Sequence, residues 1–230
     1  MCGRFTQHHT TEEVQSRFVV SATLFDPVPR YNAAPTQPIA VVVQEASTRE
    51  RILDGFQWGL IPFWAKDPAI GNKLINARSE TVAEKPAYKG LLKRRRCIIP
   101  ADGFYEWERR EGGKVRQPFH FRRRDGNLFG FAGLWDQWDS PDGSSLLTCT
   151  ILTTNANDTV GKVHDRMPVI LQSPDDEAQW LDDTVSDTAT LQALLLPYPD
   201  SLMEAVMVSR RVNSPMVDSL ELILPESENG

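Results

Sequence analysis

The sequence predicts an α+β fold: a single domain with a mostly antiparallel, curved or barrel-like β-sheet core flanked by short helices. Strand-like segments dominate the middle of the chain, hairpin turns join several of them, and the helical segments are too short to be βαβ crossovers. The 230 residues are 40% hydrophobic and 24% charged, near globular averages, and contain no repeat or long linker. We expect one domain over residues 1–224 and a short polar tail over 225–230.

The first half of the chain offers one well-marked helix and one well-marked strand. Residues 10–13 form a capping-box pattern ahead of the apolar positions Val14 and Phe18, which predicts a short helix. The β-branched run 39–43 is typical of a buried strand. Residues 74–81 predict a strand or turn that leads into a short helix.

The second half predicts a succession of strands and then two helices. Residues 103–109 alternate, with Tyr105 and Trp107 on one face and Glu106 on the other. Glycine-containing turns at 111–113 and 125–127 follow. The further expected strands are residues 118–122, 128–134, 146–152, 169–171 and 203–208. The expected helices are a short one capped within residues 155–158, one from the Ser173 cap to about residue 181, and one over residues 188–196 that Pro197 stops.

The net charge of −6 hides a strong asymmetry along the chain. Residues 1–129 carry 21 Lys and Arg against 14 Asp and Glu, whereas residues 130–230 carry 4 against 17. Because polyanion binding depends on local potential rather than on total charge, the basic runs at 93–96 and 122–124 permit a nucleic-acid surface. Such runs are also common on ordinary solvated faces, so the charge pattern alone does not demonstrate that surface.

The cysteines and the N-terminus indicate the cellular compartment. Cys2, Cys97 and Cys149 are widely spaced without a Cys-x-x-Cys pair, which excludes a disulfide scaffold and disfavours a cysteine zinc site. Cys97 and Cys149 lie among apolar strand residues, and we expect them to be buried. No secretory signal and no apolar run of the ~18–20 residues that span a bilayer is found. We therefore expect a cytoplasmic protein, nucleoid-associated if bacterial, without a membrane partner.

Cys2 is the most informative position in the sequence. Aminopeptidases remove Met1 when the second residue is small, and the mature chain would then begin with a cysteine. Its amine and thiol, with ordinary pKa values of about 7.7–8.0 and 8.5, are both partly reactive near neutral pH. The amine condenses with an aldehyde to an imine, and the adjacent thiol closes on the imine carbon to give a thiazolidine. By itself, however, a cysteine at this position can be an accident of sequence.

His164 and Glu106 are candidates for proton transfer. His164 lies in a polar loop beside Asp165 and Arg166, where an imidazole can act as an acid or a base near pH 7. Glu106 lies between two aromatic residues, so desolvation would raise its pKa. The alternatives are a structural histidine and a solvent-facing glutamate paired with Arg109 or Arg122.

The remaining histidines favour no metal site. His8, His9 and His120 show no metal-ligand spacing and no His-Glu-x-x-His pattern. We therefore expect neither a metal nor a cofactor.

Two further segments contain residues suited to nucleic-acid contacts. Asn76 can orient an intermediate through its amide, and Arg78 presents a bidentate fork to a phosphate. Alternatively, Asn76 caps a helix and Arg78 pairs with Glu80. Phe63 and Trp64 can stack on an exposed base, although an aromatic pair is more often part of a core.

Six segments together resemble the abasic-site processing family, also called the SOS-response-associated peptidase family. The resemblance extends from Met1 to about Leu224, and six blocks in the order of the family are far more specific than any single motif. The matching blocks are residues 1–5 (MCGRF), 30–35 (RYNAAP), 58–62 (WGLIP), 76–81 (NARSET), 96–107 (RCIIPADGFYEW) and 164–168 (HDRMP).

The resemblance implies a function and a role for each candidate residue. Members of the family bind abasic sites in single-stranded DNA, including DNA at replication forks, and their N-terminal cysteine forms a thiazolidine with the C1′ aldehyde that shields the lesion. It implies Cys2 as nucleophile, Glu106 in sugar ring opening and proton transfer, His164 in proton transfer, Asn76 in holding the adduct, Arg4, Arg78 and Arg166 as phosphate or DNA contacts, and Trp64 in base stacking. A one-to-one crosslinker needs no second copy, so we expect a monomer.

Two other functions remain open at the level of sequence. One is a cysteine peptidase with Cys2, His164 and Glu106 as a triad, whose target could be Met1 itself, so that the cleavage is self-maturation. The other is a non-covalent reader of modified or single-stranded DNA, which would be indifferent to Cys2. An imine at C1′ also acidifies the C2′ proton, so a minor β-elimination (lyase) activity is conceivable beside the crosslink.

Overall fold

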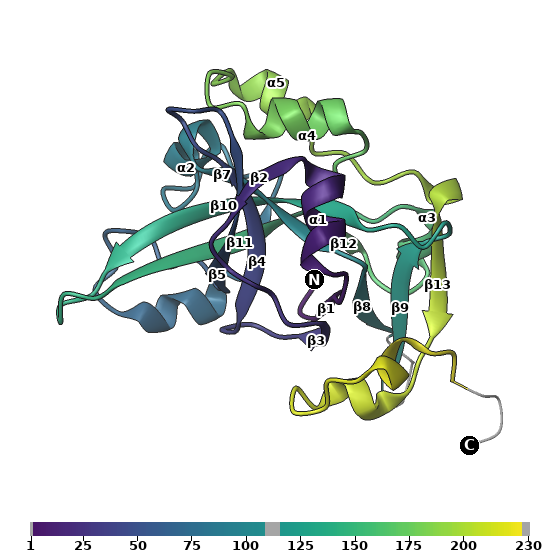
Figure 1. Cartoon of the computed structure of the whole chain (residues 1–230). Helices are drawn as coiled ribbons and strands as arrows, with labels where there is room; N and C mark the ends of the chain where they lie inside the picture. Colours follow the sequence, from purple (N-terminus) through teal and green to yellow (C-terminus); the bar gives the residue numbers. More distant parts are fainter. Residues whose placement is uncertain (1, 109–115, 227–230) are drawn as a thin grey trace.

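The computed structural model describes residues 2–108 and 116–226 and contains two β-sheets that share one core (Figure 1). The smaller sheet has five strands, and all of its described pairings are antiparallel. Its strands are, in spatial order, β13 (Met203–Met207), β9 (Gln117–Arg123), β8 (Gly103–Glu108), β1 (Phe5–Gln7) and β3 (Arg30–Ala33). Because β1 lies between β8 and β3, the segment that follows Cys2 is in the interior of this sheet.

The larger sheet has eight strands and is mostly antiparallel. Its path is β12 (Arg166–Pro168), β11 (Ser145–Asn155), β10 (Phe129–Asp139), β7 (Arg96–Ala101), β4 (Pro38–Gln44), β5 (Arg51–Trp58) and β2 (Val20–Thr23), and β6 (Asn76–Arg78) pairs with β11 off this path. β11 runs parallel to β5 and β6, and β2 runs parallel to β5. The long β10–β11 hairpin projects from the body of the molecule (Figure 1). Its turn contains Gly143 at φ 89°, a left-handed conformation that glycine adopts without strain.

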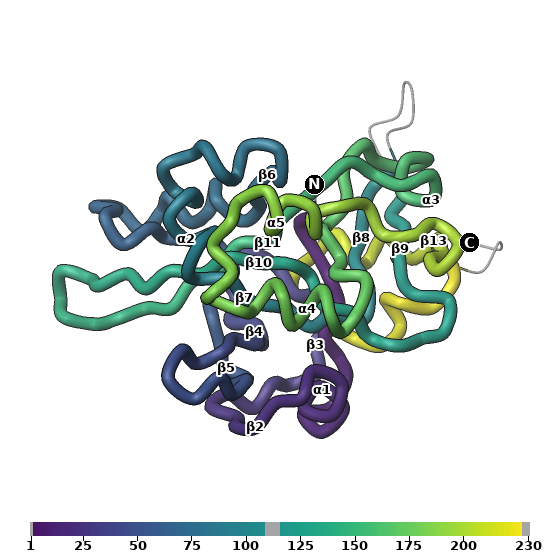
Figure 2. Tube along the Cα trace, turned by 90° about the horizontal axis from the view of Figure 1, so that it is seen from above, coloured from purple at the N-terminus to yellow at the C-terminus, as the bar shows by residue number. Residues whose placement is uncertain are grey.

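Short helices cover the larger sheet on the face away from the smaller one (Figure 2). They are α1 (Thr11–Phe18), α2 (Lys89–Arg94), α4 (Pro174–Leu181) and α5 (Thr188–Ala193). Alternate residues of β4 explain the two layers: Ala40 and Val42 pack with these helices, whereas Ile39 and Val41 face the shared core. Trp180 of α4 is fully buried and donates its indole N–H to the carbonyl of Cys97 at 2.9 Å.

The smaller elements complete the described chain. They are α3 (Asp158–Gly161) and the 3₁₀ segments η1 (Pro68–Lys73), η2 (Asp200–Leu202), η3 (Arg210–Asn213) and η4 (Leu220–Ile223). Within the described ranges, none of the helices has the length and apolar character that crossing a bilayer requires.

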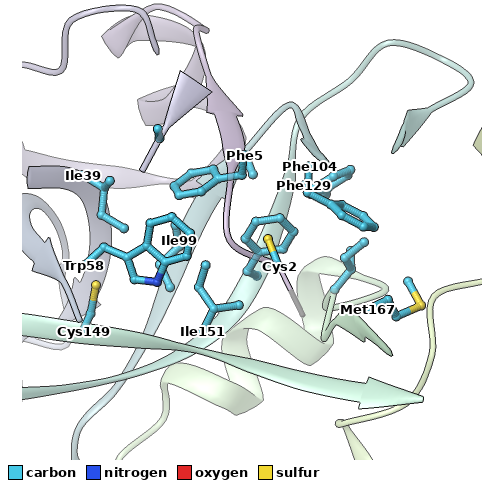
Figure 3. Close-up of a cluster of buried hydrophobic side chains, with 14 of the residues drawn as sticks. Cys2, Phe5, Ile39, Trp58, Ile99, Phe104, Phe129, Cys149, Ile151 and Met167 are labelled. Atoms are coloured by element: carbon cyan, nitrogen blue, oxygen red, sulfur yellow. The ribbon is translucent and has the colours of Figure 1, made fainter. Parts of the chain in front are cut away.

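The two sheets face each other across a core of large apolar side chains (Figure 3). Phe5 of β1 packs edge-on against Trp58 of β5 and Phe131 of β10, with ring centroids 5.2 and 5.8 Å apart. Phe104 of β8 packs against the same Phe131. Since complete burial of one such side chain contributes ~1.5–3 kcal/mol, these contacts hold β1 and β8 against the larger sheet. Cys2 belongs to this cluster (Figure 3).

The fold class expected from the sequence is confirmed, as are its best-marked elements. In α1, Glu13 N–H donates to the Thr10 hydroxyl at 3.2 Å and Thr10 N–H donates to the Glu13 carboxylate at 2.8 Å. α4 follows its Ser173 cap and ends at Leu181, as expected. The runs 39–43, 118–122 and 146–152 lie within β4, β9 and β11, and the run 128–134 lies within β10 except for Leu128, since β10 begins at Phe129. β10 and β11 each extend at least three residues beyond the expected end. Cys97 and Cys149 are fully buried.

Helix boundaries differ from the expectation in two places. α5 ends at Ala193 rather than at residue 196, because the N–H groups of Leu194 and Leu195 bond three residues back in a tight final turn. Residues 79–88 form turns rather than a helix, and α2 begins only at Lys89. Pro86 explains this delay, since it has no N–H and disfavours helical backbone in the residue before it.

Strand boundaries also differ. The strand expected at 169–171 lies at Arg166–Pro168, because the Val169 and Leu171 N–H groups bond to different strands, β11 and β10, instead of following one partner in register. β13 ends at Met207, one residue early, and the Glu226 N–H bonds to the Met207 carbonyl. The expected turn at 111–113 lies outside the described residues.

Candidate functional site

Cys2 lies in the core, three residues before the start of β1. Its side chain is fully buried and packs with residues of both sheets. Burial raises the pKa of the Cys2 thiol far above its ordinary value, and the negative charge of Glu106 raises it further. The thiol donates a weak hydrogen bond to the Arg4 carbonyl, with sulfur and oxygen 3.6 Å apart. This cysteine is therefore present as a thiol at neutral pH.

Glu106 reaches the neighbourhood of Cys2 because β8 pairs with β1. The register places Phe5 opposite Phe104, two residues before Glu106 in β8. Glu106 is only 3% exposed, and burial raises the pKa of its carboxyl, an effect to which the charge of Asp165 adds. A carboxyl with a raised pKa holds its proton closer to neutral pH, as a general acid requires.

Asn76 contacts Cys2 directly. β6 runs parallel to β11, with Asn76 in register with Ile151, and the Asn76 amide donates to the Cys2 carbonyl at 2.7 Å. This bond fixes the backbone of Cys2. Arg78 lies two residues further along β6, so the pleat places its side chain on the same face as that of Asn76, where it is exposed.

His164 follows α3 and precedes β12. Its neighbours Val163 and Met167 pack against the cluster that contains Cys2, and its side chain is 15% exposed. The Arg166 N–H donates to His164 Nδ1 at 3.0 Å, which leaves Nε2 as the protonated nitrogen of the neutral ring. The carboxylate of Asp165 lies 3.0 Å from the same Nδ1 and would form an ion pair with the protonated ring.

Two of the four residues expected to contact DNA are exposed. Arg78 lies at the surface, and Trp64 is 51% exposed beside Phe63 at 70%. Trp64 also borders a hollow of about 280 Å³ with Lys66 and Lys73, which combines an aromatic plane with positive charge. Such a combination fits single-stranded nucleic acid.

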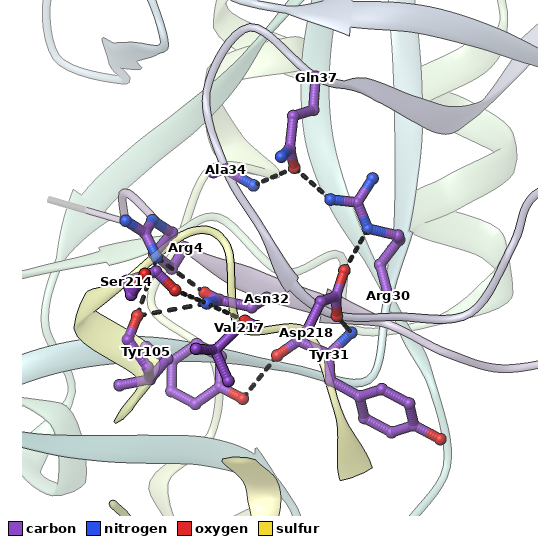
Figure 4. A network of polar contacts seen from close by, with 11 residues as sticks. Arg4, Arg30, Tyr31, Asn32, Ala34, Gln37, Tyr105, Ser214, Val217 and Asp218 are labelled. Carbon is purple, nitrogen blue, oxygen red and sulfur yellow. Dashed lines mark hydrogen bonds and ion pairs between the residues drawn. The ribbon is translucent and has the colours of Figure 1, made fainter. Parts of the chain in front are cut away.

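The other two arginines make internal contacts. Arg166 forms a two-pronged ion pair with Glu80 and also donates to the Thr153 carbonyl at 2.7 Å. Arg4 donates to Asn32 and to the Val212 carbonyl, both at 2.9 Å, and so fastens the C-terminal segment to β1 and β3 (Figure 4). Their expected contact with DNA stays a prediction.

The structure corrects two of the alternative pairings. Glu80 forms its ion pair with Arg166, not with Arg78, although the Arg78 charge also lowers the pKa of Glu80 after the larger effect of Arg166. Arg122, a suggested partner of Glu106, instead forms an ion pair with Glu204. The other suggested partner, Arg109, lies outside the described residues.

Sequence reasoning missed the residues that support the exposed aromatic pair. Asp136 of β10 accepts the Phe63 N–H at 2.9 Å and also the guanidinium of Arg95. Trp138 donates its indole N–H to the Ala65 carbonyl at 2.7 Å. No local pattern indicates these contacts, because they join residues 41 or 73 positions apart.

The fold also assembles a group of potential metal ligands that the spacing of the histidines did not predict. His8 and His9 follow β1, and Asp102 precedes β8. The three therefore lie at the ends of these strands opposite to Cys2 and Glu106.

Comparison with known proteins gives a consistent set of similarities. A family model described as SOS response associated peptidase (SRAP) matches residues 1–215. The chain is 45% identical to abasic site processing protein YoqW of Bacillus subtilis, over 97% of this chain and 99% of that protein. It is 36% identical to abasic site processing protein HMCES of Gallus gallus, over 86% of this chain and 66% of that protein.

Solved structures agree on the fold. A protein from Bacteroides thetaiotaomicron superposes with a TM-score of 0.85 at 24% identity, covering 98% of this chain and 100% of the other. A protein from Bordetella bronchiseptica superposes with a TM-score of 0.76 at 28% identity, covering 90% of this chain and all of the other.

Proposed function

The chain belongs to the SOS response associated peptidase (SRAP) family, and on this premise we propose that it captures abasic sites in DNA covalently through Cys2. The names of its relatives supply the lesion, since YoqW and HMCES are abasic site processing proteins. The observation that carries the proposal is the position of Cys2 as the second residue, with its carbonyl held by Asn76 and its thiol within the field of Glu106.

The proposed reaction consumes one aldehyde and releases one water. Once Met1 is removed, the α-amine of Cys2 adds to the C1′ aldehyde of the ring-opened sugar and forms a carbinolamine. Loss of the hydroxyl as water gives an imine. The thiol sulfur then bonds to the imine carbon while its proton passes to the nitrogen, which closes the five-membered thiazolidine. Because the second bond forms within one residue, proximity favours closure.

Glu106 supplies the proton that the departing hydroxyl needs. Burial raises the pKa of its carboxyl, so a larger fraction is protonated near neutral pH than for an exposed glutamate. The same carboxyl serves in opening the sugar ring, where the ring oxygen takes up a proton as the aldehyde forms. Proton transfer by a positioned group of this kind contributes typically ~10²–10⁴-fold to a rate.

Asn76 and His164 have supporting roles in this proposal. The hydrogen bond from Asn76 to the Cys2 carbonyl restricts the rotation that would swing the new amine away from the sugar. His164, with Nδ1 accepting the Arg166 N–H, presents Nε2 as the group that gives or takes a proton during imine formation and its reversal.

The DNA is single-stranded in this proposal. Trp64 and Phe63 are exposed aromatic planes of the kind that stack on unpaired bases. Lys66 and Lys73 supply positive charge beside Trp64, and Arg78 supplies it beside Asn76 in β6. Arg166 and Arg4 act mainly by holding β12 and the C-terminal segment in place. A phosphate contact by either arginine would come in addition to these internal bonds.

Peptide cleavage is the second candidate, because the family description names a peptidase. The burial that raises the pKa of the Cys2 thiol disfavours the thiolate that a thiol peptidase uses. We therefore restrict this activity to the bond between Met1 and Cys2, as self-maturation.

A denaturing-gel assay with a uracil-excised single-stranded oligonucleotide tests the proposal. The wild type should give a crosslink that survives heating, and Cys2→Ala and Cys2→Ser should both lack it, because the ring needs sulfur as well as nitrogen. Cys149→Ala is the matched control, since it removes another buried cysteine and should crosslink normally. A stable crosslink in Cys2→Ala would refute the proposal. Equal crosslinking rates on single-stranded and double-stranded substrates would refute the proposed preference for single-stranded DNA.

A further inference from the structure

The geometry points to a site for a divalent transition-metal ion, best matched to Zn²⁺, formed by His8, His9 and Asp102. One ligand atom from each residue lies within 4.8 Å of the others. Two imidazole nitrogens and one carboxylate oxygen are donors that Zn²⁺ prefers, and three protein ligands leave a fourth position for water. This inference is independent of the proposed DNA chemistry.

The fold builds this group from two paired strands. Thr6 of β1 is opposite Gly103 of β8, and the Asp102 N–H donates to the Thr6 carbonyl at 2.9 Å. The His8 N–H in turn donates to Asp102 Oδ2 at 2.5 Å. One bond thus anchors the backbone of Asp102 and the other anchors its carboxylate, as a preorganised ligand requires.

The two rings are held by stacking. The His8 ring stacks on Tyr31 of β3 at a centroid distance of 4.9 Å and on His9 at 5.3 Å. The rings lie within 17° of parallel in both cases, so their orientation is set before any ion arrives. Little side-chain entropy is then lost on binding.

Both rings already point a nitrogen at the carboxylate. His9 Nδ1 lies in contact with Asp102 Oδ1, and the two form an ion pair when the ring is protonated. His8 Nε2 lies 3.7 Å from Asp102 Oδ2. Donor atoms of all three residues therefore meet at one carboxylate, and a small adjustment of the side chains would let a cation share them.

The charge and access of the site also suit a cation. His9 borders a surface hollow together with Glu12 and Glu13 of α1, whose carboxylates attract cations. The arginines of this hollow are neutralised, since Arg17 pairs with Glu177 and Arg123 pairs with Asp125.

The consequence of binding would be a clamp across β1 and β8. Cys2 precedes β1, and Glu106 lies in the second half of β8, so an ion that joins His8 and His9 to Asp102 at the other end would hold the two strands in register. Because the unfolded chain does not present this arrangement, binding stabilises the folded state, and the melting temperature rises with the concentration of the metal.

The test uses the full chain without an affinity tag, dialysed against chelator and titrated with ZnCl₂ by calorimetry. We expect one ion per chain, and a rise in melting temperature at saturating Zn²⁺. His9→Ala should weaken binding about tenfold or more, by the loss of a ligand. His164→Gln is the matched control, since it removes a histidine outside the cluster and should bind Zn²⁺ as the wild type does.

A second variant and a second probe keep the test decisive. His8→Phe keeps an aromatic ring against Tyr31 but removes the nitrogen ligands, so it should stay folded and lose both the binding and the thermal shift. Co²⁺ gives d–d absorption bands whose intensity reports a four-coordinate site, and these bands should appear in the wild type and be absent in His8→Phe. Absence of saturable binding to the wild type, or equal affinity in the cluster variants, would overturn the inference.

Discussion

Glu106 combines burial with a catalytic role in this account, and its charge state should therefore control the rate. Because burial raises the pKa of its carboxyl, the protonated form that donates to the carbinolamine persists to higher pH than in an exposed glutamate. The crosslinking rate should therefore fall as pH rises through this pKa. Deprotonation of the α-amine raises the rate over the same range, so the rate is divided by that of a small aminothiol that reacts with the same sugar.

Glu106→Gln tests this role directly. The amide cannot donate a proton in the same way, so single-turnover crosslinking should slow by about 10²-fold or more while the melting temperature changes little. Glu108→Gln, two residues along the same strand, is the control and should react at the wild-type rate. An unchanged rate in Glu106→Gln would remove this residue from the mechanism.

Arg166 distinguishes a structural residue from a DNA contact. It is almost buried and forms a two-pronged ion pair with Glu80. Arg166→Met should therefore destabilise the protein by about 1.5–3 kcal/mol, measured by urea unfolding. In a double-mutant cycle, Glu80→Gln should cost little further stability once Arg166→Met is present, because both changes remove the same ion pair. A loss of DNA affinity without a loss of stability would instead indicate that Arg166 contacts a phosphate of the DNA.

At the scale of elements, the β10–β11 hairpin supports the aromatic loop that follows β5. Asp136 and Trp138 bond to the backbone of this loop, which leaves the rings of Phe63 and Trp64 exposed rather than buried. A loop held in this way loses little entropy when a base stacks on it.

Trp64→Ala should weaken binding to single-stranded DNA by roughly 1–3 kcal/mol, the usual loss when one stacking aromatic is removed. Fluorescence anisotropy with an undamaged labelled oligonucleotide measures this without the covalent step. Leu24→Ala, which changes an exposed apolar residue between β2 and β3, is the control and should bind normally. Equal affinities for all three proteins would place the DNA elsewhere.

The elements also show what the sequence can and cannot predict. The capping box at Thr10 and the Ser173 cap depend on neighbouring residues only, so α1 and the start of α4 could be predicted. The short strands β1 and β3 could not, because three or four residues acquire their structure from the strands they pair with. The ligand group of His8, His9 and Asp102 was missed for the same reason, since pairing of β1 with β8 assembles it.

For the candidate site, the sequence supplied the residues but not their contacts. Cys2, Asn76 and Glu106 were singled out by their chemistry, and the fold places Asn76 against the Cys2 backbone and Glu106 within electrostatic reach of the thiol. Arg4 and Arg166 were singled out for their charge, yet their main contacts are to Asn32 and Glu80. Charge is visible in a sequence, whereas the partner that neutralises it depends on the whole fold.

At the scale of the whole molecule, a buried histidine should make stability depend on pH. His120 is 1% exposed, and burial, with a smaller effect of Arg122, lowers its pKa to about 3. Between the unfolded value near 6.5 and this folded value, the unfolded chain binds the additional proton, so stability falls as pH decreases.

The contribution of His120 should approach about 1.4 kcal/mol per pH unit between pH 6 and 4. Urea unfolding of the wild type and of His120→Gln over this range checks it, because the glutamine variant should show a shallower dependence whatever its absolute stability. Identical slopes would indicate that His120 is already accessible to protons in the folded state.

The central claim is that the nitrogen and the sulfur of Cys2 are both bonded to the same sugar carbon after reaction. The most direct measurement is mass spectrometry of the N-terminal peptide released from the crosslink by nuclease and protease digestion, after alkylation of all free thiols in the unfolded protein. We predict a peptide that begins at Cys2, carries the sugar minus one water, and resists alkylation at that cysteine. A peptide that retains Met1, an alkylated Cys2, or a sugar attached to a lysine would contradict the account.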